Sequence, residues 1–161
     1  MPYTRPTTDI AKEGLFNILQ NNLEIDELKV LDLFGGTGSI SYELASRGAA
    51  DLTIVEKDNQ MYDFIKKTST ELAFENFRVV KSDVFRFINT TTEKYDLIFA
   101  GPPYALTTID DLPIKVFEKQ LLNKDGWFIL EHTPANDYKK FPNYKTQRNY
   151  GTTVFSIFIN N

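Results

Sequence analysis

The sequence predicts an α/β fold, a three-layer α/β/α sandwich with a mostly parallel sheet. Short apolar runs, typical of strands buried on both faces, alternate with stretches whose apolar residues recur at helical spacing. A glycine-rich turn at residues 35–38 joins the first of these strands to a helix, as at the start of a βαβ unit. The chain closes with two stretches, 145–150 and 152–159, joined near Gly151, which predict an antiparallel hairpin.

The composition is that of one packed domain spanning residues 1–161. Hydrophobic residues make up 42% of the chain, including 13 Phe and 8 Tyr, which favours a core over disorder. The sequence has no apolar run approaching the roughly 20 residues of a membrane span, and its first residues lack the apolar centre of a signal peptide. The absence of Cys excludes disulfides and thiolate metal sites. We therefore expect a cytoplasmic monomer without a metal.

The net charge of −4 argues against a surface coated for nucleic acid, but the charge is unevenly distributed. Residues 134–161 carry a balance of +3, from Lys139, Lys140, Lys145 and Arg148 against Asp137. Aromatic residues interleave with these cations: Tyr138, Phe141, Tyr144 and Tyr150. Single-stranded RNA is bound by such mixtures of cations and stacking rings. The alternative is a solvated hairpin whose aromatic side chains belong to the core.

Each element follows from a local pattern. Arg5 precedes a proline and is extended, and Thr8 or Asp9 caps a helix over about residues 9–22. The remaining strands are expected at 30–34, 51–56, 77–80, 95–100 and 127–131, and the remaining helices around 39–47, 61–74, 84–88 and 114–121.

The first glycine turn predicts a cofactor loop. A pyrophosphate site prefers a third glycine where this chain has Ser41, and the carboxylate of Asp32 just before the loop would repel a phosphate. A carboxylate there suits a cationic amino acid group. The spacing D-x-F-x-G-x-G is that of Rossmann-like enzymes that use S-adenosylmethionine, which assigns cofactor contacts to Asp32, Phe34, Gly35, Gly36 and Gly38. The alternative is a plain βα turn that binds nothing.

Two further acidic residues follow strands. Glu56 ends the second strand 20 positions after Gly36, the spacing at which an acid binds both ribose hydroxyls, and Lys57 lies beside it. Asp83 follows the third strand and is placed to accept from an adenine amine, with Val84 or Phe85 against the ring. Glu56 could instead be a solvated strand-end charge, and Asp83 only a helix cap.

The fourth strand leads into Gly101-Pro102-Pro103-Tyr104. The two prolines fix the chain and leave neighbouring carbonyls to accept from an incoming amino group, while Tyr104 offers a face on which a base can stack. The alternative is a stiff turn. His132, the only histidine, ends the fifth strand, where a structural role is the more frequent one.

Taken together, these motifs resemble the RsmD family of S-adenosylmethionine-dependent methyltransferases, which methylate the N2 amino group of a guanine in bacterial small-subunit ribosomal RNA. The resemblance covers nearly the whole chain and rests on segments 5–9, 13–19, 31–38, 46–49, 55–58 and 102–104. It implies a seven-stranded Rossmann-like sheet with one antiparallel strand. It also implies that residues 32–38 hold the methionine moiety, Glu56 the ribose and Asp83 the adenine. Pro102 to Tyr104 would hold the target base, and Arg5, Thr7 and Thr8 would contact the RNA.

The chain departs from the family pattern in two places. The family motif is Asp-Pro-Pro-Tyr, and Gly101 stands where the acid accepts a hydrogen bond from the target amine. We expect reduced activity, because one positioned polar group is worth about 10²–10³ in rate. Family members also carry a basic hairpin before the Arg5 segment, so we expect either a fragment or weaker RNA binding.

The expected reaction is in-line methyl transfer to an exocyclic amine, without a metal or a covalent enzyme intermediate. Three alternatives stay open. The first is another amine substrate, such as adenine N6 in DNA or a glutamine side chain. The second is a cofactor-binding module that has lost catalysis through Gly101. The third is a nicotinamide-dependent oxidoreductase, which Asp32 and Ser41 oppose.

Overall fold

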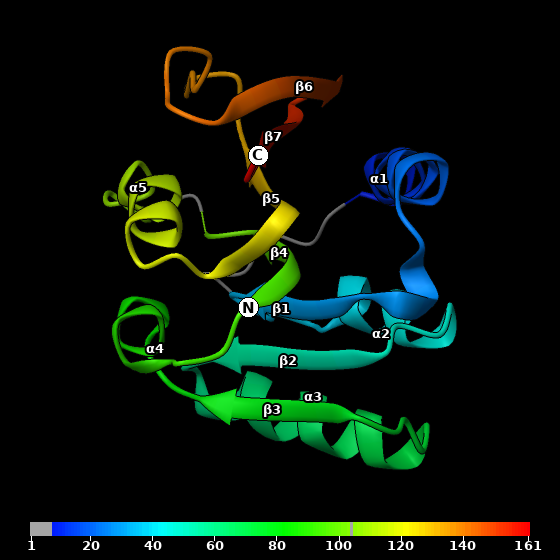
Figure 1. The fold of residues 1–161 in the computed structure, drawn as a ribbon. Helices are drawn as coiled ribbons and strands as arrows, with labels where there is room; N and C mark the ends of the chain where they lie inside the picture. The colour runs from blue at the N-terminus through cyan, green and yellow to red at the C-terminus, as the bar shows by residue number, and fades with distance from the viewer. Residues whose placement is uncertain (1–7, 104) are drawn as a thin grey trace.

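The structure is a computed structural model that describes residues 8–103 and 105–161, so the predictions for Arg5, Thr7 and Tyr104 lie outside it. It contains one seven-stranded sheet with strand order β3-β2-β1-β4-β5-β7-β6 (Figure 1). The first five strands pair in parallel, and β7 runs antiparallel to both β5 and β6. The strands are β1 (Lys29–Leu33), β2 (Asp51–Glu56), β3 (Phe77–Lys81), β4 (Tyr95–Ala100), β5 (Leu122–His132), β6 (Tyr144–Tyr150) and β7 (Thr153–Ile159). The predicted fold class is confirmed.

Helices cover both faces of the sheet and enclose two cores. They are α1 (Asp9–Asn22), α2 (Ser39–Ser46), α3 (Asn59–Glu71), α4 (Val84–Thr90) and α5 (Asp111–Glu118), with a 3₁₀ turn at Ile25–Glu27. One core joins α1, α2 and α3 to side chains such as Val30, Ile54 and Phe99. The other joins α4 and α5 to Leu31, Val55 and others. Successive residues of a strand point to opposite faces of the sheet, so a strand that is apolar throughout contributes side chains to both cores.

Several element ends differ from the sequence prediction. The fifth strand begins at Leu122 and passes through Gly126, where the prediction placed a connection. The third helix ends at Glu71, and Phe74 beyond it packs its ring 5.4 Å from that of Phe77. The sequence prediction extended the helix too far, because Phe74 keeps the helical spacing of apolar residues although it lies in the following loop.

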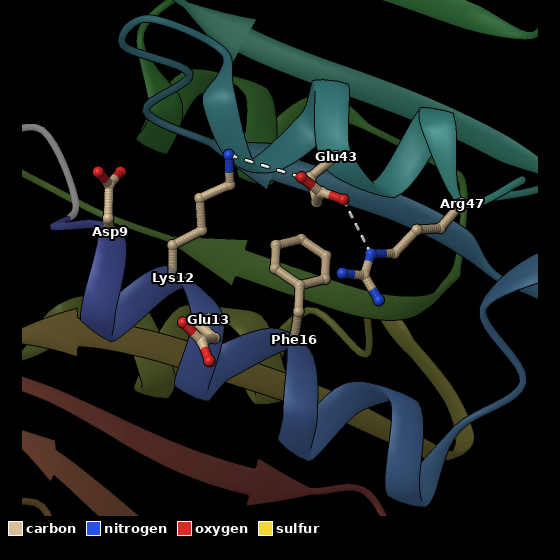
Figure 2. Close-up of a pocket in the computed structure, with 6 residues that line it drawn as sticks. All are labelled: Asp9, Lys12, Glu13, Phe16, Glu43 and Arg47. Atoms are coloured by element: carbon tan, nitrogen blue, oxygen red, sulfur yellow. Dashed lines mark hydrogen bonds and ion pairs between the residues drawn. The ribbon is translucent and has the colours of Figure 1, made fainter.

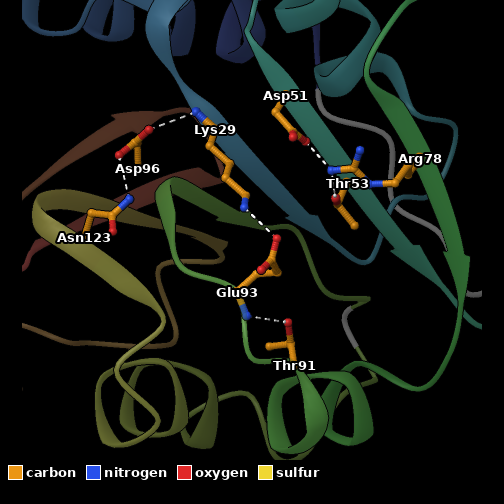
Figure 3. Close-up of polar contacts among 8 residues, drawn as sticks. All are labelled: Lys29, Asp51, Thr53, Arg78, Thr91, Glu93, Asp96 and Asn123. Carbon is orange, nitrogen blue, oxygen red and sulfur yellow. Dashed lines mark hydrogen bonds and ion pairs between the residues drawn. The ribbon is translucent and has the colours of Figure 1, made fainter.

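Polar contacts tie the strands together at their amino ends (Figure 3). The carboxylate of Asp96 accepts from the Lys29 backbone N–H and from the Asn123 side-chain amide, both at 2.9 Å. Arg78 pairs with Asp51 across β3 and β2. These contacts stabilise one edge of the sheet. The opposite edge, where the parallel strands end, holds the predicted site residues.

The aromatic residues of the C-terminal segment belong to the core. The side chain of Tyr138 is 0% exposed, lies edge-on to His132 and Phe141, and donates a hydrogen bond from Oη to Asp110 at 2.8 Å. Phe141 and Tyr144 pack against the same core. Lys139, Lys140, Lys145 and Arg148 are exposed. The structure thus favours the solvated hairpin over an array of stacking rings.

Candidate functional site

Five candidate residues lie at the carboxyl ends of five neighbouring strands. Asp32 is in β1, Glu56 ends β2 and Asp83 follows β3; on the other side of β1, Gly101 follows β4 and Glu131 is near the end of β5. The register places Asp32 beside Ile54 of β2 and Phe99 of β4. In open α/β sheets, ligands bind outside this edge, at the point where the strand order reverses. Here the order reverses at β1, next to the glycine loop.

The glycine loop is a tight turn that ends at the first residue of α2. Phe34, Gly36 and Gly38 have φ of 63°, 59° and 83°, in the left-handed region that favours glycine. The Gly35 N–H donates to the Val55 carbonyl at 3.0 Å, and the Gly38 N–H donates to the Gly35 carbonyl at 2.8 Å. The loop is therefore held against β2, and its backbone closely approaches the space above the strand ends.

Asp32 lies buried beneath this loop. Its carboxylate is 2% exposed and accepts a hydrogen bond from the Ser41 hydroxyl at 2.6 Å. The pKa of Asp32 is raised to about 7, mainly by burial; the hydrogen bond from Ser41 lowers it, and the nearby Glu56 and Glu131 carboxylates add to the rise. The serine at the third-glycine position is thus a partner of Asp32, a contact that the sequence analysis missed.

Glu56 braces the loop from the neighbouring strand. Its Oε1 accepts from the Gly36 N–H at 2.8 Å, and its Oε2 accepts from the Asp58 N–H at 2.9 Å. Each carboxylate oxygen retains a further lone pair, so both can accept from vicinal hydroxyls without losing these bonds. Lys57 beside it is exposed.

Asp83 caps α4 and remains exposed at its surface. Its Oδ2 accepts from the Arg86 N–H at 3.1 Å, which is the capping geometry. Val84 is 4% exposed and belongs to the core, while Phe85 is only partly buried. Of the two side chains proposed to contact an adenine ring, Phe85 therefore offers the larger surface.

The Gly101-Pro102-Pro103 segment leaves β4 directly above the sheet. All described peptide bonds are trans, and the Pro103 carbonyl accepts from the Leu106 N–H at 3.1 Å, which closes a turn. That carbonyl is engaged within the loop. Pro102 is buried and Gly101 is half-buried.

The structure adds Glu131, which the sequence analysis did not select. Its side chain is 2% exposed, and a Cβ built on Gly101 would lie 3.3 Å from its Oε1. The sequence signal was present, because a charged residue ends an otherwise apolar strand directly before His132.

His132 faces the opposite layer from Glu131. Its Nε2 lies 2.7 Å from the Ser156 hydroxyl and its Nδ1 2.7 Å from the Thr133 carbonyl. Its ring packs on Tyr138, which indicates a structural role in the core. Within residues 8–103 and 105–161, no group of three His, Asp or Glu is arranged to hold a metal ion, and no helix is long and apolar enough to cross a bilayer.

A separate surface hollow of about 210 Å³ lies between α1 and α2 (Figure 2). Its lining residues are Asp9, Lys12, Glu13, Phe16, Glu43 and Arg47. Glu43 lies 3.7 Å from the Lys12 ammonium and accepts from Arg47 at 2.9 Å, while the Arg47 guanidinium lies 4.8 Å from the centre of the Phe16 ring. These charges satisfy one another, and the hollow contains none of the predicted site residues.

Comparison with known proteins points to one family. A family model described as "Conserved hypothetical protein 95" matches residues 1–159. Ribosomal RNA small subunit methyltransferase D of Buchnera aphidicola is 26% identical over 97% of this chain and 81% of its own length. The putative rRNA methyltransferase YlbH of Bacillus subtilis is 31% identical over 80% of this chain and 71% of its own length.

Other comparisons extend the range of relatives. The release factor glutamine methyltransferase of Shewanella oneidensis is 38% identical, over 80% of this chain and 51% of its own length. The solved structure of the putative methyltransferase yhhF from Escherichia coli has a TM-score of 0.87 at 24% identity, and the match covers 98% of this chain and 89% of that one. That likeness establishes the class I methyltransferase fold. Because the family model matches almost the entire sequence, the chain belongs to the Conserved hypothetical protein 95 family, the family of ribosomal RNA small subunit methyltransferase D.

Proposed function

We propose that this protein transfers a methyl group from S-adenosylmethionine to the exocyclic N2 of a guanine in small-subunit ribosomal RNA. The observation that carries the proposal is the row of acidic residues at three adjacent strand ends, Asp32, Glu56 and Asp83, around a glycine loop. Family membership and the names of relatives such as ribosomal RNA small subunit methyltransferase D support the choice of substrate.

The residues at the loop fit the methionine end of S-adenosylmethionine. That group carries an ammonium and a sulfonium, and the carboxylates of Glu56 and Glu131 lie close enough to Asp32 to add to the effect of burial in raising its pKa. A cationic ligand relieves this repulsion, whereas a pyrophosphate would increase it. Gly36 and Gly38 adopt a left-handed backbone that favours glycine, and because glycine has no side chain the same space stays open.

The residues farther along the edge fit the nucleoside. Glu56 retains lone pairs for two ribose hydroxyls while it braces the loop. Asp83 is exposed beside Phe85, so one residue can accept from an exocyclic amine while the other packs against the ring. Their order along the sheet, from Asp32 to Glu56 to Asp83, matches the order of methionine, ribose and adenine in the ligand.

In the proposed reaction the protein positions the methyl donor and the target amine and excludes water from between them. S-adenosylmethionine supplies an electrophilic methyl group, so positioning is the main requirement, worth roughly 7–11 kcal/mol of barrier in favourable cases. The Pro102-Pro103 segment restricts the loop beside the strand ends. We propose that Tyr104, outside the described residues, stacks on an unstacked guanine, as in enzymes that act on flipped bases.

A glutamine side chain is the second candidate substrate. The match to a release factor glutamine methyltransferase favours it, although this chain spans only about half of that protein. The glycine loop and the Pro-Pro loop serve both reactions, since each methylates a planar NH₂ group.

The test is transfer of labelled methyl from S-adenosylmethionine into unmethylated small ribosomal subunits. Naked ribosomal RNA, DNA and a release-factor protein serve as parallel substrates. We expect label only in the ribosomal samples, in guanine N2 after digestion, and thermal stabilisation of the protein by S-adenosylhomocysteine. Label in the release factor alone would establish the second candidate. Stabilisation without transfer to any substrate would indicate a cofactor-binding module.

A further inference from the structure

A carboxylate from the neighbouring strand lies beside Gly101. A Cβ built at position 101 would lie 3.3 Å from Oε1 of Glu131 and 3.3 Å from the Phe99 ring. Carbon–oxygen contacts this short are tight, so the space for a side chain at 101 is already partly filled by the glutamate. Glycine at position 101 places no side-chain atom against this carboxylate.

The sheet register explains the juxtaposition. Ala100 pairs with Leu130 in the parallel β4–β5 ladder, so Gly101 and Glu131 are the next residues on adjacent strands. Asp32, Phe99 and Ile129 share one row across β1, β4 and β5, and residues two positions further along a strand keep the same face. Glu131 therefore lies on the face that carries Asp32, at the edge where the candidate site is.

Within residues 8–103 and 105–161, Asp32 is the other buried carboxylate on this face, and it lies at the cofactor loop. Its Oδ2 accepts from Ser41 of α2 at 2.6 Å, beneath the glycine loop. Glu131 is two strands away from Asp32, beside the Gly101-Pro102-Pro103 segment. The two carboxylates thus have separate places, one at the cofactor loop and one at the target loop.

We propose that Glu131 is a catalytic residue that accepts a hydrogen bond from the target amine, in the role that a side chain at position 101 would otherwise fill. This inference rests on the function proposed above. As the amine lone pair forms the new N–C bond, the C–S bond breaks and its electron pair passes to sulfur. The nitrogen becomes cationic and the Glu131 carboxylate stabilises that charge through its hydrogen bond; the surplus proton passes to solvent after the transfer.

The experiment measures methyl transfer in variants that remove, conserve or relocate the carboxylate. Glu131→Met removes every acceptor and should lower kcat by about 10²–10³ while S-adenosylhomocysteine binding persists. Glu131→Gln keeps a carbonyl oxygen at the same place and should retain most of the activity. His132→Gln, on the opposite face of the same strand, is the matched control and should transfer methyl at the wild-type rate.

The more decisive experiment moves the carboxylate from position 131 to position 101. Gly101→Asp in the Glu131→Met background should restore transfer, because a carboxylate returns to the same space from β4. Gly101→Asp alone should not increase transfer, since it places two carboxyl groups side by side. A second readout is thermal unfolding, in which Gly101→Asp should lower the midpoint more when Glu131 is present than when Met replaces it.

The outcomes separate the two proposals. An inactive wild-type protein on every amine substrate would overturn the proposed function, and the role of Glu131 with it. An active wild type with equally active Glu131→Met, or a Gly101→Asp single variant faster than wild type, would overturn the role of Glu131 alone. Failure of the double variant to regain transfer, with the single Glu131→Met variant inactive but folded, would also overturn it.

Discussion

The carboxyl group of Asp32 predicts how cofactor binding depends on pH. Burial raises its pKa to about 7 in the ligand-free protein, and a cationic ligand favours the ionised form. We expect affinity for S-adenosylmethionine to rise with pH and level off above about pH 7. Asp32→Asn should weaken binding by roughly 10- to 100-fold, the worth of a hydrogen bond or contact to a charge, and flatten the pH profile. Isothermal titration between pH 5.5 and 8.5 measures both effects.

The same pKa predicts how the free energy of unfolding depends on pH. The carboxyl binds its proton more tightly in the folded protein than in the unfolded chain, where its pKa is 3.8. Its contribution is therefore fully favourable below about pH 4 and is lost as pH rises to about 7, a decrease of up to about 4 kcal/mol. Urea denaturation of the ligand-free protein at several pH values should show that decrease, and Asp32→Asn should abolish it. An unchanged slope in the variant would mean that another group is responsible.

Gly38 is a loop position where a side chain would meet both an unfavourable backbone conformation and a close neighbour. Its φ is 83°, and an added Cβ would lie 2.6 Å from Cζ of Tyr42. Gly38→Ala should destabilise the fold by about 1–3 kcal/mol through backbone strain and weaken cofactor binding as well. Gly151→Ala is the matched comparison, with φ of 62° and no heavy atom within 4 Å of its added Cβ. Equal losses in the two variants would assign the effect to φ alone.

At the scale of elements, α1 reaches across the sheet to the C-terminal hairpin through Gly14. A Cβ at this glycine would lie 2.1 Å from the ring of Tyr150 at the end of β6. Alanine normally improves a helix by about 0.5–1 kcal/mol, whereas overpacking costs about 1–3 kcal/mol. Gly14→Ala should therefore lower the free energy of unfolding.

Two further variants isolate that contact. Asn17→Ala on the exposed side of α1 should be neutral or stabilising. Replacing Tyr150 with Leu should reduce the cost of Gly14→Ala, because the ring that the new methyl meets is gone. Chemical denaturation of all four variants gives the coupling. Additive effects would show that α1 and β6 do not constrain each other through this pair.

At the scale of the whole molecule, charge is segregated between an acidic body and a basic C-terminal segment. The exposed cations Lys139, Lys140, Lys145 and Arg148 lie there within a net charge of −4. If this segment binds RNA, replacing the three lysines with Gln should weaken binding, and the slope of log K against log salt should fall by about 2. Filter binding at several salt concentrations measures it. S-adenosylhomocysteine binding should be unaffected, and an unchanged RNA slope would place the RNA surface elsewhere.

Local patterns were sufficient for much of the fold. The range 9–22 for the first helix and the end of the second strand at Glu56 match the structure, because capping residues and runs of apolar residues act over a few positions. The third helix and fifth strand were misjudged at their ends. There Phe74 and Gly126 take positions that depend on partners distant in the sequence, the ring of Tyr42 and the Asp96 carbonyl of β4.

The sequence by itself determined the class of the sheet, the glycine loop and the acidic residues at the ends of the first three strands, because each depends on residues that are close together in the chain. Only the tertiary structure decided which groups meet. It paired Asp32 with Ser41, buried Tyr138 and its neighbours in the core, and placed Glu131 beside Gly101. The last two residues are 30 positions apart and become adjacent solely through the parallel register of β4 and β5. The carboxylate that we propose in place of the missing motif acid thus comes from a distant part of the sequence, which only the fold brings to this position.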